Sequence, residues 1–289
     1  MQIIIGSEAL AAGHVTRYEL TADYRRVLPD VYVLKRAPLT LVDHIRSAWL
    51  WSHRRAIVCG VTASALHGAR WVDEKTPIEL NLGHNKAPGG VIVRRDTLLE
   101  AEVVQQHGMP VTSIERTAFD LARRGPVGRA VQRLDALANA THFKSADVLA
   151  IGERHPRLRG LRRLPAVLDL VDAGAQSPKE TWLRMLLIAA GFPRPRTQIP
   201  VPWPDGYPRY FLDMGWEEFM TAVEYDGQHH RTDPVQYRND VARSEYVTAK
   251  GWRRIAVLAG DREADIVRRV ERLGVPRAWS GIDRSLIGR

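Results

Sequence analysis

The stretch VEYDGQHH, residues 223–230, follows an apolar run that is typical of a buried β-strand. It carries two acids, Glu224 and Asp226, and two imidazoles, His229 and His230. Because side chains alternate along a strand, the two acids are expected on one face. Carboxylates gathered in a core repel one another unless they are protonated or neutralised, and a divalent cation is a common means of neutralising them. The stretch therefore indicates a charged site at the end of a core strand.

A third carboxylate belongs to the preceding segment, RYFLDMGW, in which Asp213 stands at the end of another strand. A turn over residues 214–218 is expected to fold this strand back beside the next one. Hard oxygen ligands with few imidazoles favour Mg²⁺ or Mn²⁺ over Zn²⁺. We therefore predict that Asp213, Glu224 and Asp226 converge on Mg²⁺ or Mn²⁺. In the alternative interpretation the two acids of VEYDGQHH are exposed strand-end charges and the histidines are loop residues.

A well-defined amphipathic helix precedes these strands, in SPKETWLRMLLIAAGF, residues 177–192. Ser177 suits the N-cap, Pro178 the first helical position, and Gly191 the position just beyond the end. Glu180, three residues after the N-cap, is expected to complete a capping box, which gives it a structural role.

Composition limits the class of protein. A chain of 289 residues, 45% of them apolar, can bury a sizeable core and suggests two domains, or two domains and a small appendage. A single cysteine, Cys59, excludes an internal disulfide and a four-cysteine zinc site. No signal peptide or membrane-spanning run is recognisable, so we expect a cytoplasmic protein with no membrane partner. Lys and Arg number 42 against 33 Asp and Glu, and this charge of +9 favours a polyanion such as nucleic acid.

The first 37 residues predict a small winged-helix unit. Ser7 is expected to cap a short helix that Gly13 stops, Thr16 to open a second helix, and Pro29 with Asp30 to turn a hairpin. In the functional interpretation a set of residues faces a DNA groove and its phosphates: Thr16, Arg17, Tyr18, Arg25 and Arg26. In the alternative interpretation the unit is a packing module with a solvated basic edge.

Residues 38–150 alternate helices and strands. LVDHIRSAWLW has helical spacing, AIVCGVTASALHG is expected to lead from a strand into a helix, and IELNL and GVIVRR are expected strands. VTSIERTAFDLARR is expected to begin a helix at Thr112 or Ser113. His67, followed by Gly68, fits a packing or capping role better than that of a metal ligand.

Beyond this region, RHPRLRGLRR over residues 154–163 is either a phosphate-contacting strip or a solvated linker. AVLDLVDAGA is expected to form a helix that ends near Gly174, with the main domain boundary at about residue 170.

Three of these segments carry a family resemblance over residues 1–150. The hairpin YRRVLPDVYVL, the helix SALHG and the segment PVTSIERTAFDLA are similar to bacterial proteins of the AbiEi antitoxin and transcriptional-regulator type. The resemblance implies DNA as a partner, and a cognate toxin or another defence-system protein as a second one.

The segments of residues 177–258 resemble the very-short-patch-repair endonuclease group of the PD-(D/E)XK nuclease superfamily. The resemblance implies a mixed sheet with flanking helices and metal-dependent phosphodiester hydrolysis. It also implies roles for particular residues: Asp213 as the principal metal ligand, Glu224 and Asp226 beside it, Glu180 as the helix acid, His230 as acid or base, and His229, Asp240 and Arg243 in support.

One departure from this superfamily concerns its lysine, whose position Asp226 occupies. The electrophile or base that this lysine would supply then has to come from a histidine or from Lys250, or else the site is weak.

Taken together, these observations predict an α/β protein. The expected parts are a winged-helix-like unit (1–37), an AbiEi-like α/β region (38–150), a basic helical linker (151–173), a nuclease domain (174–275) and a tail (276–289). The expected function is that of a DNA-binding, Mg²⁺-dependent endodeoxyribonuclease. The first alternative is a non-catalytic antitoxin or transcriptional regulator that retains a nuclease fold. The second is a protein-interaction module of an intracellular defence system.

Overall fold

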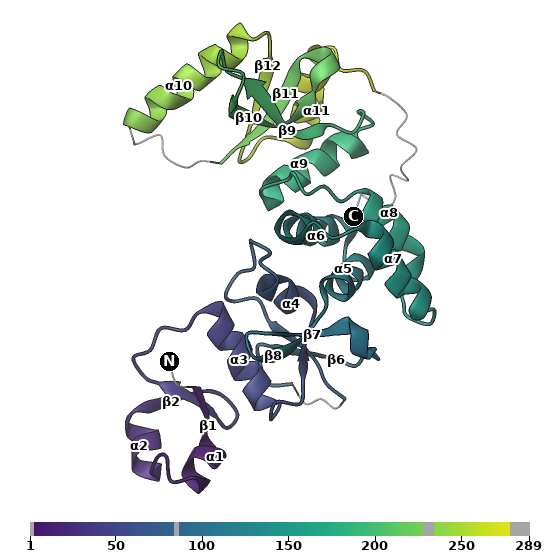
Figure 1. Cartoon of the computed structure of the whole chain (residues 1–289). Helices are drawn as coiled ribbons and strands as arrows, with labels where there is room; N and C mark the ends of the chain where they lie inside the picture. Colours follow the sequence, from purple (N-terminus) through teal and green to yellow (C-terminus); the bar gives the residue numbers. More distant parts are fainter. Residues whose placement is uncertain (1–2, 84–86, 228–233, 278–289) are drawn as a thin grey trace. The chain divides into compact units, whose positions relative to one another are not determined.

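The computed structural model describes residues 3–83, 87–227 and 234–277, with the side chains of 234–237 left aside. The fold is α/β, as predicted (Figure 1). The chain divides into two compact units, the first of residues 1–124 and 140–168, the second of residues 125–139 and 169–289. The division after residue 168 lies close to the expected boundary. Residues 125–139, which the sequence placed in the middle region, belong to the second unit.

The first unit contains two sheets and the helices that cover them. Its strands are β1 (Ile3–Ile5), β2 (Tyr24–Leu28), β3 (Val31–Leu34), β4 (Ile57–Val58), β5 (Ile78–Asn81), β6 (Val91–Arg94), β7 (Val103–Gln106) and β8 (Met109–Thr112). Its helices are α1 (Gly6–Ala11), α2 (Arg17–Ala22), α3 (Leu41–Trp51), α4 (Gly60–Leu66), α5 (Ile114–Arg123), α7 (Ser145–Arg154) and α8 (Leu164–Asp169), with short 3-10 turns η1 (Glu100–Glu102) and η2 (Leu161–Arg163).

The N-terminal elements follow the predicted order of helix, helix and hairpin, and β1 adds an unpredicted strand in the order β1-β3-β2. Thr16 caps α2 as expected, in a capping box with Glu19. Ser7 is not a cap, because its amide and hydroxyl both donate to the carboxylate of Asp30 in the hairpin turn. The Asp30 side chain therefore ties the start of α1 to the hairpin.

The second sheet has the strand order β6-β5-β4-β8-β7 and contains the strands predicted from IELNL and GVIVRR. Its core includes Ile45 of α3, Leu80 of β5 and Val111 of β8, all fully buried. His67 ends α4 and its Nε2 lies 2.7 Å from the carbonyl oxygen of Thr112, which is the packing role expected of it. Cys59 is buried, and burial raises the pKa of its thiol far above the usual value.

The conspicuous motif of this unit, SIERTAFDLA, forms α5 and has a structural role. Ser113 caps the helix, as expected. Arg116 is fully buried, and its guanidinium donates to the carboxylates of Glu102 (2.5 Å) and Asp120 (3.2 Å). His155, from the RHPRLRGLRR segment, contacts Glu102 at 2.7 Å. We call Glu102, Arg116, Asp120 and His155 the Arg116 network.

The RHPRLRGLRR segment is not a separate linker. Residues 151–168 pack within the first unit, where Ile151, Leu164 and Leu168 are buried. The following helix, α8, ends at Asp169, five residues before the expected end at Gly174. Arg154 remains exposed, whereas Arg163 is half-buried and donates to the carbonyl of Ala122.

The second unit is built on one four-stranded sheet. Its elements are α6 (Val127–Thr141, of which residues up to 139 belong here), α9 (Pro178–Ala189), β9 (Arg196–Pro202), β10 (Pro208–Trp216), the 3-10 turn η3 (Glu217–Phe219), β11 (Thr221–Asp226), α10 (Pro234–Ala249), β12 (Arg253–Leu258) and α11 (Glu263–Arg272).

The sheet order is β12-β11-β10-β9, and it is mixed. Strand β10 pairs antiparallel with β11, as predicted for the strands that bear Asp213 and Glu224, and β11 pairs parallel with β12. Val223 packs in the cluster of α9 and α11, whereas its neighbour Ala222 packs in the cluster of α10. Strand β10 does not end at Asp213 as expected but continues through Trp216, so the connecting turn is η3 and begins later than the turn expected at residues 214–218.

A buried ion pair explains why residues 125–139 belong to the second unit. The carboxylate of Asp135 on α6 accepts bonds from Arg184 (2.7 Å) and Thr181 (2.8 Å) on α9, and from the amide of Asp172 (2.8 Å). Arg184 and Asp135 are both inaccessible to solvent. Removing one partner of such a pair leaves the other charge buried and unpaired, which is costly. The contact therefore holds α6 against α9.

None of the helices formed by the described residues combines the length and apolar composition needed to cross a bilayer.

Candidate functional site

A pocket of about 220 Å³ in the second unit gathers residues of β10, β11, β12 and α10. We call it the acid pocket. Its lining consists of Asp213, Glu224, Tyr225, Asp226, Gly227, Asp240, Arg243, Arg254 and Ala256. Five of the predicted site residues are therefore brought together: Asp213, Glu224, Asp226, Asp240 and Arg243. The predicted His229 and His230 lie outside the described residues.

The pairing of β10 with β11 positions the first two acids. Met214 lies opposite Val223, and Asp213 and Glu224 are the chain neighbours of these two paired residues. The amide of Tyr225 donates to Oδ2 of Asp213 at 2.9 Å. This bond holds the Asp213 carboxylate at the edge where β11 ends, beside the acids of VEYDGQHH.

Glu224 is buried and bound by two arginines. Its Oε1 accepts from Arg243 of α10 at 2.6 Å, and its Oε2 accepts from Arg254 of β12 at 2.5 Å. Such charge-assisted bonds to a carboxylate are strong. Both oxygens of Glu224 are thus engaged with guanidinium groups, which differs from the predicted role as a metal ligand.

The environment of Asp213 differs from that of Glu224. Burial, followed by the charges of Glu180 and Glu224, raises the pKa of its carboxyl to about 7, although the Tyr225 amide and Arg243 act against this rise. In the described part of the chain Asp213 accepts the Tyr225 bond and forms no ion pair. Ionising Asp213 at neutral pH therefore creates a negative charge without a matched cation.

Glu180 lies close enough to Asp213 to raise its pKa, but it is not part of the lining of the acid pocket. Its amide receives the predicted cap from Ser177 Oγ at 3.1 Å. Its carboxylate accepts from the amide of Gln176 at 2.9 Å, one residue before the N-cap amide expected for a capping box.

A complete metal site is not formed within residues 3–83, 87–227 and 234–277. No group of three His, Cys, Asp or Glu side chains there is arranged to hold a metal ion. The predicted convergence of Asp213, Glu224 and Asp226 fails at Glu224 because Arg243 and Arg254 draw its two oxygens to themselves.

Arg254 is the site residue that the sequence interpretation missed. It lies in the expected strand WRRIAVL, and the parallel pairing of Ala222 with Arg254 brings it beside β11. Alternation along that strand was an available signal, since Ile255 and Val257 face the core and leave Arg254 on the other face. Lys250, the proposed substitute for the missing lysine, lies over the ring of Tyr246 at 5.4 Å and is not among the lining residues.

The predicted DNA-contacting residues of the first unit are exposed. Tyr18 is 80% accessible, α2 buries none of its residues, and Arg17, Arg25 and Arg26 are all exposed. Thr16 is exposed too, but its hydroxyl is engaged in the capping box with Glu19. Successive residues of β2 point to opposite faces, so Arg25 and Arg26 are expected to address different sides of the hairpin.

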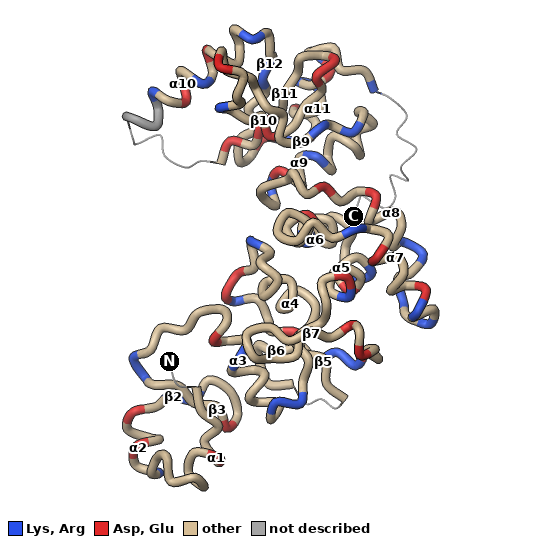
Figure 2. Tube along the Cα trace, viewed as in Figure 1, with Lys and Arg blue, Asp and Glu red and all other residues tan. Residues whose placement is uncertain are grey.

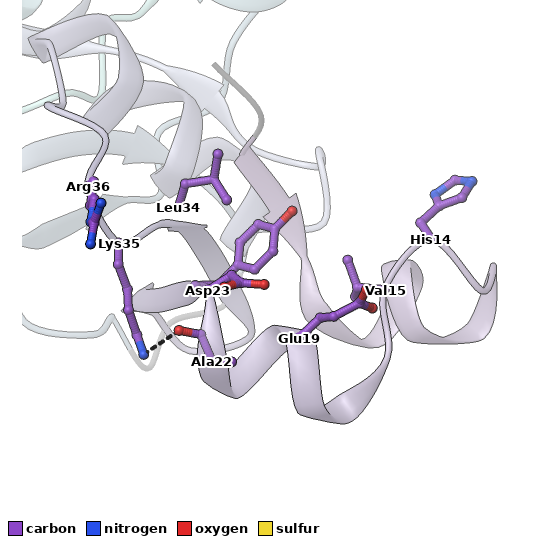
Figure 3. Close-up of a pocket in the computed structure, with 9 residues that line it drawn as sticks. His14, Val15, Glu19, Ala22, Asp23, Leu34, Lys35 and Arg36 are labelled. Atoms are coloured by element: carbon purple, nitrogen blue, oxygen red, sulfur yellow. Dashed lines mark hydrogen bonds between the residues drawn. The ribbon is translucent and has the colours of Figure 1, made fainter.

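A groove of about 730 Å³ lies beside α2 (Figure 3). Its lining mixes acids, Glu19 and Asp23, with bases, Lys35 and Arg36. The Lys35 ammonium donates to the carbonyl of Ala22 at 2.7 Å and so caps the end of α2. Figure 2 likewise shows acidic and basic residues interspersed along both units. The groove is therefore not a uniformly basic anion site.

Comparison with known proteins gives relatives without an assigned function. No family model matches the chain. Two proteins of Mycobacterium tuberculosis, "Uncharacterized protein MT2308" of strain CDC 1551 and "Uncharacterized protein Rv2248" of strain H37Rv, are each 26% identical to it over 208 residues. The matched region covers 71% of this chain and 75% of each relative.

Proposed function

We propose that this chain is a DNA-binding protein whose second unit hydrolyses phosphodiester bonds with the help of Mg²⁺ or Mn²⁺. The observation that supports it best is the acid pocket, which gathers four carboxylates and two arginines from three strands and a helix. With all four acids ionised, four negative charges stand against two positive ones, a formal charge of −2. One divalent cation balances that charge.

The acids differ in their availability to a cation. Asp213 has no ion-pair partner in the described chain and carries a raised pKa, and Asp226 is exposed at the end of β11. These two side chains would hold the cation, with Glu180 behind Asp213. A bound Mg²⁺ supplies charge stabilisation and a more acidic water.

The arginines have a separate role in this proposal. By neutralising Glu224, Arg243 and Arg254 lower the repulsion that a phosphodiester meets on entering a pocket of acids. Arg243 lines the pocket, so its guanidinium is also placed to donate to a phosphate oxygen.

A second function is favoured by one specific observation. The arginine clamp on Glu224 occupies both oxygens of a predicted ligand, and Asp226 stands where the nuclease superfamily has its lysine. These features support a non-catalytic antitoxin or transcriptional regulator that retains the nuclease fold and binds DNA without cutting it.

Cleavage by the full-length protein distinguishes the two functions. Supercoiled plasmid, nicked plasmid and single-stranded DNA are incubated with Mg²⁺, with Mn²⁺ or with EDTA. We expect cation-dependent cutting by the wild type, no cutting by Asp213→Asn, and wild-type cutting by Glu218→Gln. Glu218, an exposed acid of η3, is the matched control for loss of a carboxylate. Binding to DNA without cation-dependent cutting of any substrate would replace the enzyme by the regulator.

A further inference from the structure

The β9–β10 hairpin exposes two large aromatic side chains, one in its turn and one on β10. Tyr207, in the turn, is 76% accessible, and Phe211, on β10, is 45% accessible. Large aromatic side chains bury much apolar area when they pack, so rings left in water in this way are candidates for a binding surface.

A neighbouring group of rings holds the hairpin in place. The ring centroids of Trp203 and Tyr246 are 4.2 Å apart, and Tyr210 lies about 6 Å from both. The Tyr246 hydroxyl donates to the carbonyl of Pro202 at 2.5 Å. These three rings attach the hairpin to α10, so Tyr207 and Phe211 extend from a fixed support.

Two cations lie over the rings that hold the hairpin in place. The Arg209 guanidinium lies 4.8 Å from the ring centroid of Trp203, and the Lys250 ammonium lies 5.4 Å from that of Tyr246. Arg209 also pairs with Asp205 at 3.3 Å, with both side chains largely exposed. An exposed pair of this kind contributes little, which leaves the arginine able to meet a phosphate.

The exposed rings are continuous with the acid pocket. Phe211 precedes Asp213 by two residues, about 7 Å along a strand. The carbonyl of Phe211 accepts a bond of 2.7 Å from Arg243, the arginine that also binds Glu224 in the pocket. A chain that contacts Phe211 therefore lies next to the candidate site.

We propose that Tyr207 and Phe211 form a stacking platform for unpaired nucleobases, so that the second unit acts on single-stranded or locally unpaired nucleic acid. This inference rests on the proposed function. Aromatic faces stack with unpaired bases of any sequence, whereas the bases of an intact duplex are already stacked on one another. Arg209 and Lys250 add the cations that follow a phosphate backbone.

The test is a binding measurement on the full-length Asp213→Asn protein in EDTA, which prevents cutting. Fluorescence anisotropy compares a labelled oligothymidine with a blunt duplex. In this background Tyr207→Ala and Phe211→Ala are each expected to weaken oligothymidine binding roughly ten- to a hundredfold and to change duplex binding less than about twofold. Tyr207→Phe keeps the ring and is expected to bind like its parent. Trp71→Ala removes a 62% exposed aromatic of the first unit and is the matched control.

Three results would overturn the platform: equal losses on both probes, Tyr207→Phe as weak as Tyr207→Ala, or unchanged affinity in both alanine variants. The last result would leave a protein partner as the occupant of the hairpin. Thermal melting of each variant shows that it is folded. Binding and cutting are measured separately. If oligothymidine binding depends on the two rings but the wild-type protein cuts no substrate, only the proposed hydrolysis is refuted. Cation-dependent cutting with no effect of the rings refutes only the platform.

Discussion

Two groups of acids and arginines, one in each unit, show what distinguishes a supporting network from a candidate site. In the Arg116 network, burial alone would raise the pKa of Glu102, but hydrogen bonds from His155 and Arg116 outweigh it, and the pKa is lowered. In the acid pocket, two arginines bind Glu224 while Asp213, with no ion pair in the described chain, has a raised pKa. The Arg116 network contains one arginine and the acid pocket two, so the number of arginines does not explain the difference. The difference is an acid left without a cation beside an open pocket, which is a frequent property of functional sites.

The largest difference between the two groups is expected in catalysis. Asp213→Ala is expected to lower the cutting rate by more than about 10⁴-fold while DNA binding is retained, because it removes both charge stabilisation and the activation of water. Single-turnover cleavage with Mg²⁺ measures the rate. A decrease of less than about tenfold would place the chemistry elsewhere.

His230→Ala should have a milder effect, about 10²-fold, in keeping with general acid or base work. The same cleavage assay checks it, and an effect as large as that of Asp213→Ala would assign His230 a more direct part.

The Arg116 network is expected to control stability and leave chemistry unchanged. Glu102→Gln removes a buried charge partner of Arg116 and is expected to destabilise the protein by about 3 kcal/mol. Urea unfolding measures this change, with Glu100→Gln, an exposed acid of the same turn, as the control. Loss of cutting in Glu102→Gln protein that remains folded would contradict the separation of the two groups.

A smaller effect is expected in the pH dependence of stability. The Asp213 carboxyl has a pKa of about 7 in the folded protein against its usual 3.8, so the folded state holds this proton more tightly. Its contribution is fully present below about pH 4 and is lost as the pH rises through 7. Asp213→Asn removes this dependence, so its stability relative to the wild type should increase by about 1–3 kcal/mol between pH 5 and pH 8. Urea unfolding at both pH values without divalent cations checks the sign, and a relative decrease in stability at pH 8 would contradict it.

The smallest effect concerns the first unit. Arg25→Glu together with Arg26→Glu is expected to weaken duplex binding without altering the fold, because both side chains are exposed. For each phosphate that an arginine no longer neutralises, the slope of log K against log salt should also fall by about 1. Duplex titrations at several salt concentrations provide the slope, and an unchanged slope would place the duplex-binding residues on another surface.

The sequence predicted the elements that depend on local patterns and missed those that depend on distant partners. Two apolar runs and a turn expected between them were enough to predict that β10 and β11 pair antiparallel. Strand β9 escaped prediction because Pro200 and Pro202 interrupt its pattern, although β9 is an edge strand, where proline is tolerated.

The site itself shows the same limit. Proximity of the acids followed from strand order, but the clamp on Glu224 joins residues 19 and 30 positions away. Alternation indicates which face of its strand Arg254 occupies, but it does not indicate the partner. The assignment of α6 to the second unit depends in the same way on one ion pair, Asp135 with Arg184, between residues 49 positions apart.

Divalent-cation binding is the most direct test of the difference between the two groups. Isothermal titration of Mn²⁺ at pH 8 into the wild type, Asp213→Asn and Glu218→Gln needs no knowledge of the substrate. We expect one site in the wild type and in Glu218→Gln, and its loss in Asp213→Asn. Equal binding by Asp213→Asn and the wild type, or no binding by any of the three, would contradict the assignment of Asp213 as the acid that a cation completes.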